Sequence, residues 1–203
     1  HACPDLLAES VYGLPEIHRE RLKAARLIAA PGCFPTSIIL PLAPFFRQKI
    51  IVPDSVTITS LSGVSGAGRK VELRLLYGEV NENMYAYGVP KHRHIGEIEQ
   101  ELSLAAGEKI TVTFVPHLVP LHRGMFTTIT ASLAQSKTDE DLYDILKTAY
   151  ADDPFVEVLP PTALPESRQV ANSNRIQISA RVDTRTNRLL LFSSIDNLGK
   201  GNA

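Results

Sequence analysis

Residues 27–37 read LIAAPGCFPTS, and this stretch decides how the rest of the chain is interpreted. A short apolar run ends at Pro31-Gly32, Cys33 follows, and a second apolar run begins behind it. The pattern predicts a short buried strand over 26–30 and a helix that starts after Cys33. A cysteine at such a break is either a small buried thiol at a tight corner or a nucleophile.

The helix after this break contains three prolines with different expected effects. Pro35 lies in the first turn, where the missing N–H is harmless. Pro41 and Pro44 lie further along, where a proline removes an intrahelical hydrogen bond, so we expect them to kink or end the helix.

The position of Cys33 suits nucleophilic catalysis. The amino end of a helix has unpaired N–H groups and the positive end of the dipole, which together are expected to lower the pKa of the Cys33 thiol. With Gly32 allowing close approach, the same N–H groups can receive the oxyanion that forms on an attacked carbonyl. A buried structural thiol is the commoner case, so other segments have to decide between the two.

The composition excludes several classes of protein. The 203 residues are 44% hydrophobic and 21% charged, as in a globular domain, and the net charge of −1 gives no reason to expect a nucleic-acid partner. No apolar run approaches the length of about 20 residues that spans a bilayer, so no membrane association is expected. Two cysteines make no disulfide framework, which favours a cytoplasmic location.

The apolar spacing along the rest of the chain predicts further elements. Helices are expected over 15–25, 71–77, 95–107 and 137–149, and strands over 55–61, 110–115, 125–134, 176–182 and 188–195. The last two strands are joined by DTRTN, which is typical of a hairpin. The sum is an α+β domain, with a mixed, largely antiparallel sheet and helices on one face.

The stretch PKHRHIGEIE, residues 90–99, places His92 and His94 on either side of an arginine, with Glu97 three residues later. If a helix begins near 94–95, its dipole favours neutral imidazole, the form that a general base has at pH 7. His-x-His before a carboxylate is also a metal-ligand pattern, as in cupin barrels, and two ordinary surface histidines are the third interpretation. A cupin would place this pair on a strand, whereas a helical pattern follows here.

Two further loops give weaker signals. SGVSGAGR, residues 62–69, is neither a Walker loop nor a dinucleotide fingerprint, but its backbone N–H groups can face a carboxamide or a phosphate. PHLVPLHRGM, residues 116–125, carries His117, His122 and Arg123. The arginine can grip a phosphate bidentately, although most loop arginines are simply solvated.

The chain contains, in this order, ARLIAAPGCFPTS, SLSGVSGAGRK, YAYGVPKHRHIGEIE, TFVPHLVPLHRGM and SSIDNLGKGNA. This series resembles the N-acetyl-γ-glutamyl-phosphate reductase family, the arginine-biosynthesis enzymes of the aspartate-semialdehyde dehydrogenase type. The resemblance covers nearly all 203 residues. The PGCFPT and GVPKHRHIGEI pieces are specific, and the glycine-rich loop is less so.

The resemblance implies a division into three parts. Residues 1–34 would be the tail end of a nucleotide-binding domain that carries the catalytic cysteine. Residues 35–195 would be the substrate-binding and dimerisation domain, similar to the C-terminal domain of glyceraldehyde-3-phosphate dehydrogenase, and 196–203 the start of the return to the nucleotide-binding domain. The chain begins HACPDLL and has no glycine-rich strand-turn-helix unit, so we expect it to be a piece of a longer protein.

The resemblance also implies a reaction and its residues. Cys33 would attack N-acetyl-glutamyl phosphate and expel phosphate, and NADP, in its reduced form, would deliver hydride to the thioester. His92 would be the acid/base and Glu97 an orienting carboxylate, supported by His94. Substrate contacts would come from Arg123, His94 and Ser62. The cofactor would lie against Gly63, Ser65, Gly66, Gly68 and Asn197. No metal is required, and a catalytic tyrosine matches Tyr85 or Tyr87 without a choice between them.

Other interpretations stay open. A related reductase of aspartyl or aminoadipyl phosphate would use the same chemistry, and a cysteine hydrolase would use Cys33 and His92 without a nucleotide. A dimerisation module without activity is a third class. The expected partners are a small acyl-phosphate substrate and further copies of the chain in a dimer or tetramer. Without a nucleotide-binding domain, the isolated chain is expected not to reduce substrate.

Overall fold

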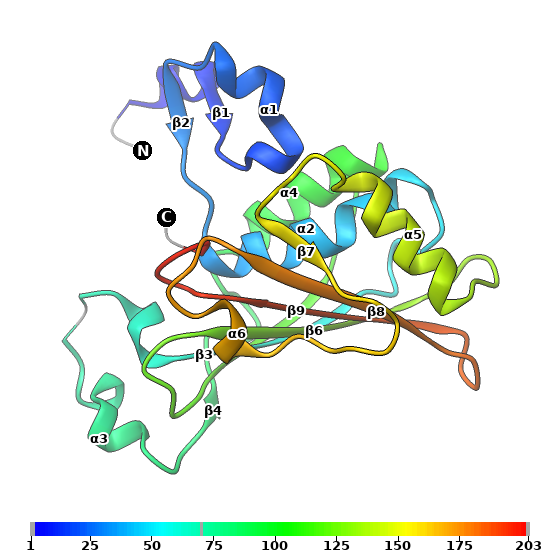
Figure 1. The fold of residues 1–203 in the computed structure, drawn as a ribbon. Coiled ribbons are helices and arrows are strands. Elements are labelled where there is room, and N and C mark those ends of the chain that lie inside the picture. The colour runs from blue at the N-terminus through cyan, green and yellow to red at the C-terminus, as the bar shows by residue number, and fades with distance from the viewer. Residues whose placement is uncertain (1–2, 70, 202–203) are drawn as a thin grey trace.

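The structure is a computed structural model that describes residues 3–69 and 71–201. Its main part is a seven-stranded sheet with the strand order β4-β5-β3-β6-β9-β8-β7 (Figure 1). The strands are β3 (Thr57–Ser62), β4 (Tyr85–Ala86), β5 (Thr113–Leu118), β6 (Met125–Ser132), β7 (Val156–Val158), β8 (Ile176–Asp183) and β9 (Arg188–Ile195). The pairs β3–β5 and β7–β8 are parallel, and the other four pairs are antiparallel. The predicted α+β class with a mixed, largely antiparallel sheet is confirmed.

Three helices cover one face of this sheet, as predicted (Figure 1). They are α2 (Cys33–Arg47), α4 (Ile95–Ala106) and α5 (Asp139–Ala149). The sequence explains two of their ends: α5 begins with a capping box between Thr138 and Asp141, and α4 ends at Gly107, whose φ of 74° favours glycine. Helix α2 is buried from Phe34 to Phe46, so it forms the centre of the core.

Helix α2 runs through both of its inner prolines without ending, which corrects the expectation of a break at Pro41 or Pro44. A proline inside a helix deprives the carbonyl four residues earlier of its N–H donor. A buried carbonyl without a donor is costly, so a helix can continue only if another group replaces the missing one.

Side-chain hydroxyl groups from other elements supply both replacements. The Ser37 carbonyl accepts a hydrogen bond from the Ser193 hydroxyl of β9 at 2.6 Å, and the Leu40 carbonyl accepts one from the buried Tyr150 hydroxyl at the end of α5. Because these two donors come from distant parts of the sequence, the local pattern around the prolines could not reveal them.

Residues 3–29 form a small lobe beside the helices (Figure 1). It contains the 3-10 helix η1 (Pro4–Glu9), the strand β1 (Ser10–Tyr12), helix α1 (Pro15–Lys23) and the strand β2 (Leu27–Ala29). The two strands pair in parallel, and the predicted burial of the second is wrong, because Leu27 and Ile28 are 40% and 54% exposed. No described element covers this strand from outside.

Several short elements differ from the sequence prediction. The expected helix over 71–77 is the 3-10 turn η3 (Leu73–Leu75) followed by α3 (Tyr77–Val80), and the two other short turns are η2 (Val64–Ala67) and α6 (Ser167–Val170). Strands β1, β4 and β7 were not predicted. Each has two or three residues, too few to show a period-2 pattern.

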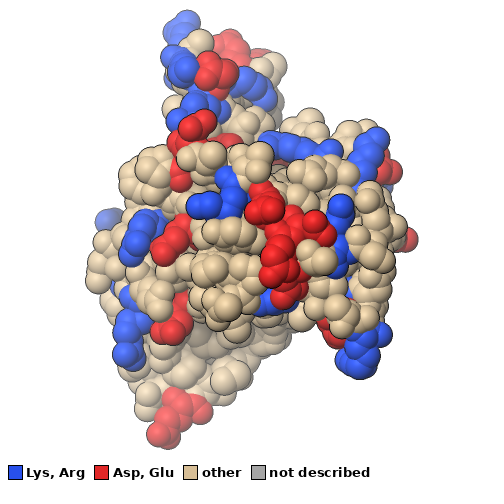
Figure 2. Space-filling view, turned by 45° about the vertical axis from the view of Figure 1, so that its right-hand side comes forward, with Lys and Arg blue, Asp and Glu red and all other residues tan. Residues whose placement is uncertain are grey.

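The surface agrees with the near-neutral net charge. Figure 2 shows basic side chains in several separate small groups on the face in view, and a larger acidic group near its middle. In the part of the chain that the structure describes, no helix has the length and apolar character needed to cross a membrane.

The replacement of the proline-blocked hydrogen bond can be tested at Tyr150. Tyr150→Phe leaves the Leu40 carbonyl buried without a donor, so we expect the free energy of unfolding in urea to fall by about 1–3 kcal/mol. In a Pro44→Ala background, residue 44 regains an N–H that donates to Leu40. The same Tyr150→Phe substitution should then cost markedly less, and an equal cost in both backgrounds would contradict this assignment.

Candidate active site

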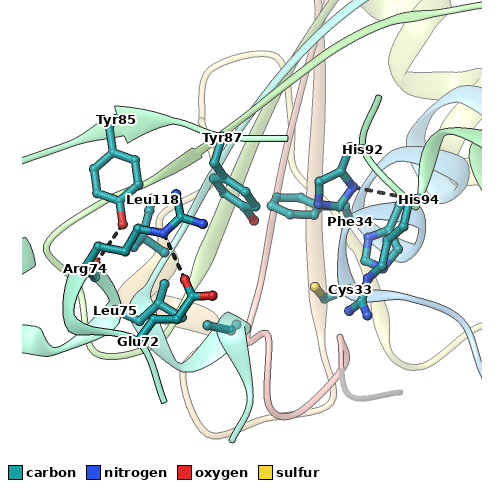
Figure 3. A pocket seen from close by; sticks show the side chains of 13 residues that line it. Cys33, Phe34, Glu72, Arg74, Leu75, Tyr85, Tyr87, His92, His94 and Leu118 are labelled. Atoms are coloured by element: carbon teal, nitrogen blue, oxygen red, sulfur yellow. Dashed lines mark hydrogen bonds and ion pairs between the residues drawn. The ribbon is translucent and has the colours of Figure 1, made fainter. Parts of the chain in front are cut away.

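Cys33, His92 and His94 line one cavity of about 220 Å³, although they come from segments about sixty residues apart in the sequence. Figure 3 shows the Cys33 sulfur pointing into this cavity below the His92 ring. The Tyr87 side chain points into the same cavity. The far end of the cavity is formed by residues around Arg74 and Tyr85. The cavity therefore joins a thiol, two imidazoles and two phenols within one concave space.

Cys33 is the first residue of α2, and Gly32 caps that helix with extended backbone. Burial raises the pKa of the Cys33 thiol above its ordinary value, while the backbone N–H groups of Phe34 and Cys33 and the charge of Arg93 lower it. The expected net lowering is therefore wrong. The helix terminus acts in the expected direction, but desolvation of the thiol outweighs it.

His92 and His94 lie just before α4, and His94 is its N-cap residue. Burial, followed by the neighbouring charge of Arg93, lowers the pKa of His92. Burial, then His92 and Arg93, lowers the pKa of His94 to about 4. Both rings are therefore neutral at pH 7, as the sequence predicted, although the cause is burial and a cation rather than the helix dipole.

The tautomer of His92 follows from its hydrogen bond. Its Nδ1 accepts the backbone N–H of His94 at 3.2 Å, so the proton of the neutral ring is on Nε2. The ring packs edge-on against Phe34, with centroids 5.5 Å apart, and against His94 at 4.9 Å. These contacts fix the imidazole in one orientation beside the cavity.

Close packing against glycine positions both imidazoles. A Cβ added at Gly32 would lie 2.6 Å from His94 Nε2, and one at Gly88 would lie 2.8 Å from the His92 ring. Gly88 also has a φ of 64°, which a larger residue adopts at a cost. The glycine before Cys33 thus serves the histidine contact as well as the turn.

Glu97 does not line the cavity among the described residues. Its Oε1 accepts the backbone N–H of Gly32 at 2.8 Å and the hydroxyl of Tyr12 at 2.6 Å. The carboxylate therefore holds the turn that precedes Cys33. An orienting role, as the resemblance implied, is consistent with this position and stays a prediction.

The glycine-rich loop reaches the cavity only through Gly66 and Ala67. Of the other residues expected to bind substrate or cofactor, Ser62, Gly63, Ser65, Gly68 and Asn197 are not part of its lining. Both polar atoms of the Asn197 amide have a partner: its oxygen accepts the Gly124 N–H at 2.7 Å, and its nitrogen donates to the Ser65 hydroxyl at 3.0 Å. These hydrogen bonds tie the loop to the end of the sheet, and the expected cofactor contacts of Asn197 and Ser65 stay a prediction.

Arg123 also lies away from the cavity lining. Its guanidinium donates to the buried Asp196 carboxylate at 3.0 and 2.8 Å and to Asn172 at 2.7 Å. Burial raises the pKa of Asp196, but the hydrogen bonds from Arg123 and from backbone N–H groups outweigh it, and the net pKa is lowered. A guanidinium neutralised in this way is not presented to the cavity, contrary to the expectation from the sequence.

Two arginines that the sequence reasoning did not select line the cavity instead, namely Arg74 and Arg93. Arg74 pairs with Glu72 at 2.9 Å, whereas the Arg93 guanidinium has no ion pair or hydrogen bond within residues 3–69 and 71–201. Tyr85 and Tyr87, the two residues that match the family's tyrosine, both line the cavity. The available signal was the position of Arg93 between the two histidines, inside the most specific motif.

The histidine pair was also considered as a metal site. Within the described ranges, no group of three His, Cys, Asp or Glu side chains is arranged to hold a metal ion. The two rings contact each other and Phe34 instead.

The site combines a cysteine at the start of a helix with two histidines on the same cavity. This arrangement suits an enzyme that uses a thiol to act on acyl groups or aldehydes. Residues 33–197 match the model of the semialdehyde dehydrogenase dimerisation domain, and the chain therefore belongs to that family. The fold is similar to aspartate semialdehyde dehydrogenase II from Vibrio cholerae, with a TM-score of 0.73 and 16% identity over 96% of this chain and 65% of that chain. A probable aspartate-semialdehyde dehydrogenase from Pseudomonas aeruginosa gives a TM-score of 0.71 at 15% identity, over 96% of this chain and 66% of that one.

Curated relatives narrow the comparison within this family. The chain is 50% identical over 203 residues to N-acetyl-gamma-glutamyl-phosphate reductase from Acetivibrio thermocellus, covering 100% of this chain and 59% of the relative. It is 51% identical over 202 residues to the enzyme of that name from Pelobacter propionicus, covering 99% and 58%. The resemblance drawn from the motifs is confirmed, and the chain spans about three-fifths of these relatives.

The packing at Gly32 can be tested with one methyl group. Gly32→Ala places a Cβ against the His94 ring, so we expect it to lower the free energy of unfolding by about 1–3 kcal/mol and to slow alkylation of Cys33. Gly96→Ala in α4 is the matched control, because an added Cβ there meets no atom within 4 Å. Equal behaviour of the two variants in urea unfolding and iodoacetamide labelling would refute the contact.

Proposed function

We propose that this chain is the catalytic and dimerisation part of an N-acetyl-γ-glutamyl-phosphate reductase. The complete enzyme would reduce N-acetyl-L-glutamyl 5-phosphate to the 5-semialdehyde with NADPH and release phosphate, a step of arginine biosynthesis. The observation that carries the proposal is that Cys33 and His92, from separate segments, line the same cavity. The identity of about 50% to reductases of this name supports the choice of substrate.

The chemistry would proceed through the Cys33 sulfur. The thiolate attacks the acyl carbon, the C–S bond forms, the C–O bond to phosphate breaks, and a thioester is left on the enzyme. NADPH, when bound, supplies the hydride that converts the thioester to a thiohemiacetal. When the thiohemiacetal collapses, its hydroxyl proton returns to His92, the C–S bond breaks, and the Cys33 thiolate and the aldehyde are released.

His92 is suited to the proton transfers of this sequence. Its pKa is lowered by burial, so the ring is neutral at pH 7, and its Nε2 carries the proton. Nε2–H can donate to the oxygen that becomes negative when hydride arrives, and it can take the proton back when the thiohemiacetal collapses. Burial raises the pKa of Cys33 and disfavours the thiolate, whereas the N–H groups at the start of α2 and the charge of Arg93 act in the opposite direction.

Arg93 is the group that we assign to the anionic part of the substrate. Its guanidinium lines the cavity, its charge lowers the pKa of Cys33, and no carboxylate among the described residues pairs with it. Guanidinium groups bind phosphate bidentately, and an unpaired one beside the nucleophile is available for this. Arg93 takes the role that the sequence reasoning had given to Arg123.

Gly66 and Ala67 form the part of the cavity wall that we assign to the cofactor. Gly66 and Ala67 are small and line the cavity, which leaves room for a flat ring beside the sulfur. Ser65 and Asn197 would act indirectly by holding that loop in place. The division at 1–34, 35–195 and 196–203 stays a prediction.

We further infer that the chain forms a homo-oligomer, a dimer or tetramer, through the sheet face opposite the helices. Thr127 and Ser193 contact Ser37 of α2, so the alternating neighbours Phe126 and Phe192 point to the other face. Their rings are 6.4 Å apart and only partly buried. A partner copy would bury this aromatic pair.

The catalytic proposal is tested in the protein at the full length of its relatives. We expect Cys33→Ala to lower NADPH-dependent reduction of N-acetyl-glutamyl phosphate by a factor of about 10³ or more, and His92→Gln by about 10² to 10³. Arg93→Ala should raise KM for the acyl phosphate, whereas Arg123→Ala should act mainly on stability. Phosphate release without NADPH consumption would indicate a hydrolase, and a preference for aspartyl phosphate would indicate a neighbouring reductase.

The oligomer is tested with a charge on the open sheet face. Phe192→Glu should shift the mass measured by light scattering toward the monomer, because a buried carboxylate without a partner is costly. Tyr143→Phe on α5, on the helix-covered side, is the control and should leave the mass unchanged. An unchanged mass for Phe192→Glu would rule out this face as the interface.

A further inference from the structure

We propose that Tyr12, in the N-terminal lobe, is a positioning residue for the Cys33 nucleophile and acts on it through Glu97. The proposal rests on the proposed function insofar as Cys33 is the nucleophile. Tyr12 does not line the cavity, so its role would be indirect.

One oxygen atom joins three elements of the fold. Glu97 Oε1, in the first turn of α4, accepts the Tyr12 hydroxyl of β1 at 2.6 Å and the backbone N–H of Gly32 at 2.8 Å. Gly32 is the N-cap of α2 and directly precedes Cys33. A shift of this carboxylate therefore moves the start of the helix that carries the sulfur.

Tyr12 is suited to fix the carboxylate in one orientation. Burial, followed by the hydrogen bond and charge of Glu97, raises the pKa of Tyr12 far above its usual value, so the phenol remains a donor throughout the working pH range. A hydroxyl that donates to a carboxylate makes one of the stronger hydrogen bonds in proteins. With Oε1 held by Tyr12, the same atom stays in place for the Gly32 N–H.

The N-terminal lobe is rigidly tied to this junction by further contacts. Tyr12 pairs with Ala29 across the two strands, and the Gly13 N–H donates to the Ala29 carbonyl at 2.8 Å. One turn beyond Glu97, the buried Glu101 carboxylate contacts His18 of α1 at 2.6 Å. The lobe therefore meets α4 at two successive turns and leads directly into the cysteine segment.

At this junction, Glu97 affects the pKa of the Cys33 thiol in two opposite ways, through the position of the start of α2 and through its own charge. The backbone N–H groups of Cys33 and Phe34 favour the thiolate only if α2 begins in its observed position. The negative charge of Glu97 disfavours the thiolate, and Arg93 favours it. The other titratable side chains on the cavity wall near the sulfur are Tyr87, His92 and His94. The two contributions of Glu97 can thus be separated by experiment.

The test measures iodoacetamide alkylation of Cys33 against pH in a Cys3→Ser background, which removes the other thiol. Tyr12→Phe keeps the charge of Glu97 and loses one hydrogen bond, so we expect about a threefold to tenfold slower reaction at pH 7 and a higher pH midpoint. Glu97→Gln keeps an acceptor oxygen and loses the charge, so its midpoint should move lower. Tyr143→Phe should match the unaltered background.

A double-mutant cycle tests whether Tyr12 acts through Glu97. In a Glu97→Ala background, Tyr12→Phe should change the alkylation rate by less than about twofold, because the link to Gly32 is already gone. In the protein at the full length of its relatives, Tyr12→Phe should lower kcat and leave KM nearly unchanged.

Three outcomes would overturn the proposal. The first is an unchanged alkylation rate in Tyr12→Phe, and the second is a pH midpoint of Tyr12→Phe that moves lower, as expected for Glu97→Gln. The third is an effect of Tyr12→Phe on the alkylation rate that is equally large in the Glu97→Ala background. Alkylation requires neither substrate nor cofactor, so these results are independent of whether the reductase activity is found. Unfolding curves of each variant identify any loss of rate that arises from unfolding alone.

Discussion

The arrangement of the site depends on how helix α2 begins. The backbone N–H of Gly32 is held by Glu97, and its missing side chain leaves the space that the His94 ring occupies. One residue thus sets the distance between the cysteine segment and the histidine segment. Because both contacts involve backbone or a Cβ position, little adjustment is possible without moving Cys33 itself.

A rigid support behind the site makes this constraint effective. Helix α2 is buried along most of its length and carries two prolines that would interrupt it in isolation. Hydroxyl groups of Ser193 and Tyr150 satisfy the carbonyls that the prolines leave without donors. The helix is therefore specified by its tertiary neighbours, one on β9 of the sheet and one at the end of α5.

The electrostatics of the cavity depend on burial, on the charge of Arg93 and on the N–H groups at the start of α2. Desolvation keeps both histidines neutral and raises the pKa of Cys33, while Arg93 and the N–H groups at the start of α2 favour the thiolate. A bound anionic substrate would contact Arg93 and alter this balance. The carboxylate of Glu97 is outside the cavity lining and accepts the backbone N–H of Gly32 and the hydroxyl of Tyr12.

The sequence alone predicted the α+β class, the largely antiparallel sheet and the family, because apolar periodicity and the PGCFPT and HRH motifs are local signals. It also selected Cys33 and His92, which the fold brings to one cavity. Only the tertiary structure decided which arginine faces that cavity: Arg123 is neutralised by Asp196, seventy-three residues away, and Arg93 is not. The same holds for the uninterrupted α2, the exposed β2 and the raised pKa of Cys33. Each depends on which groups from distant segments supply hydrogen bonds, charges or cover, and spacing along the chain does not carry that information.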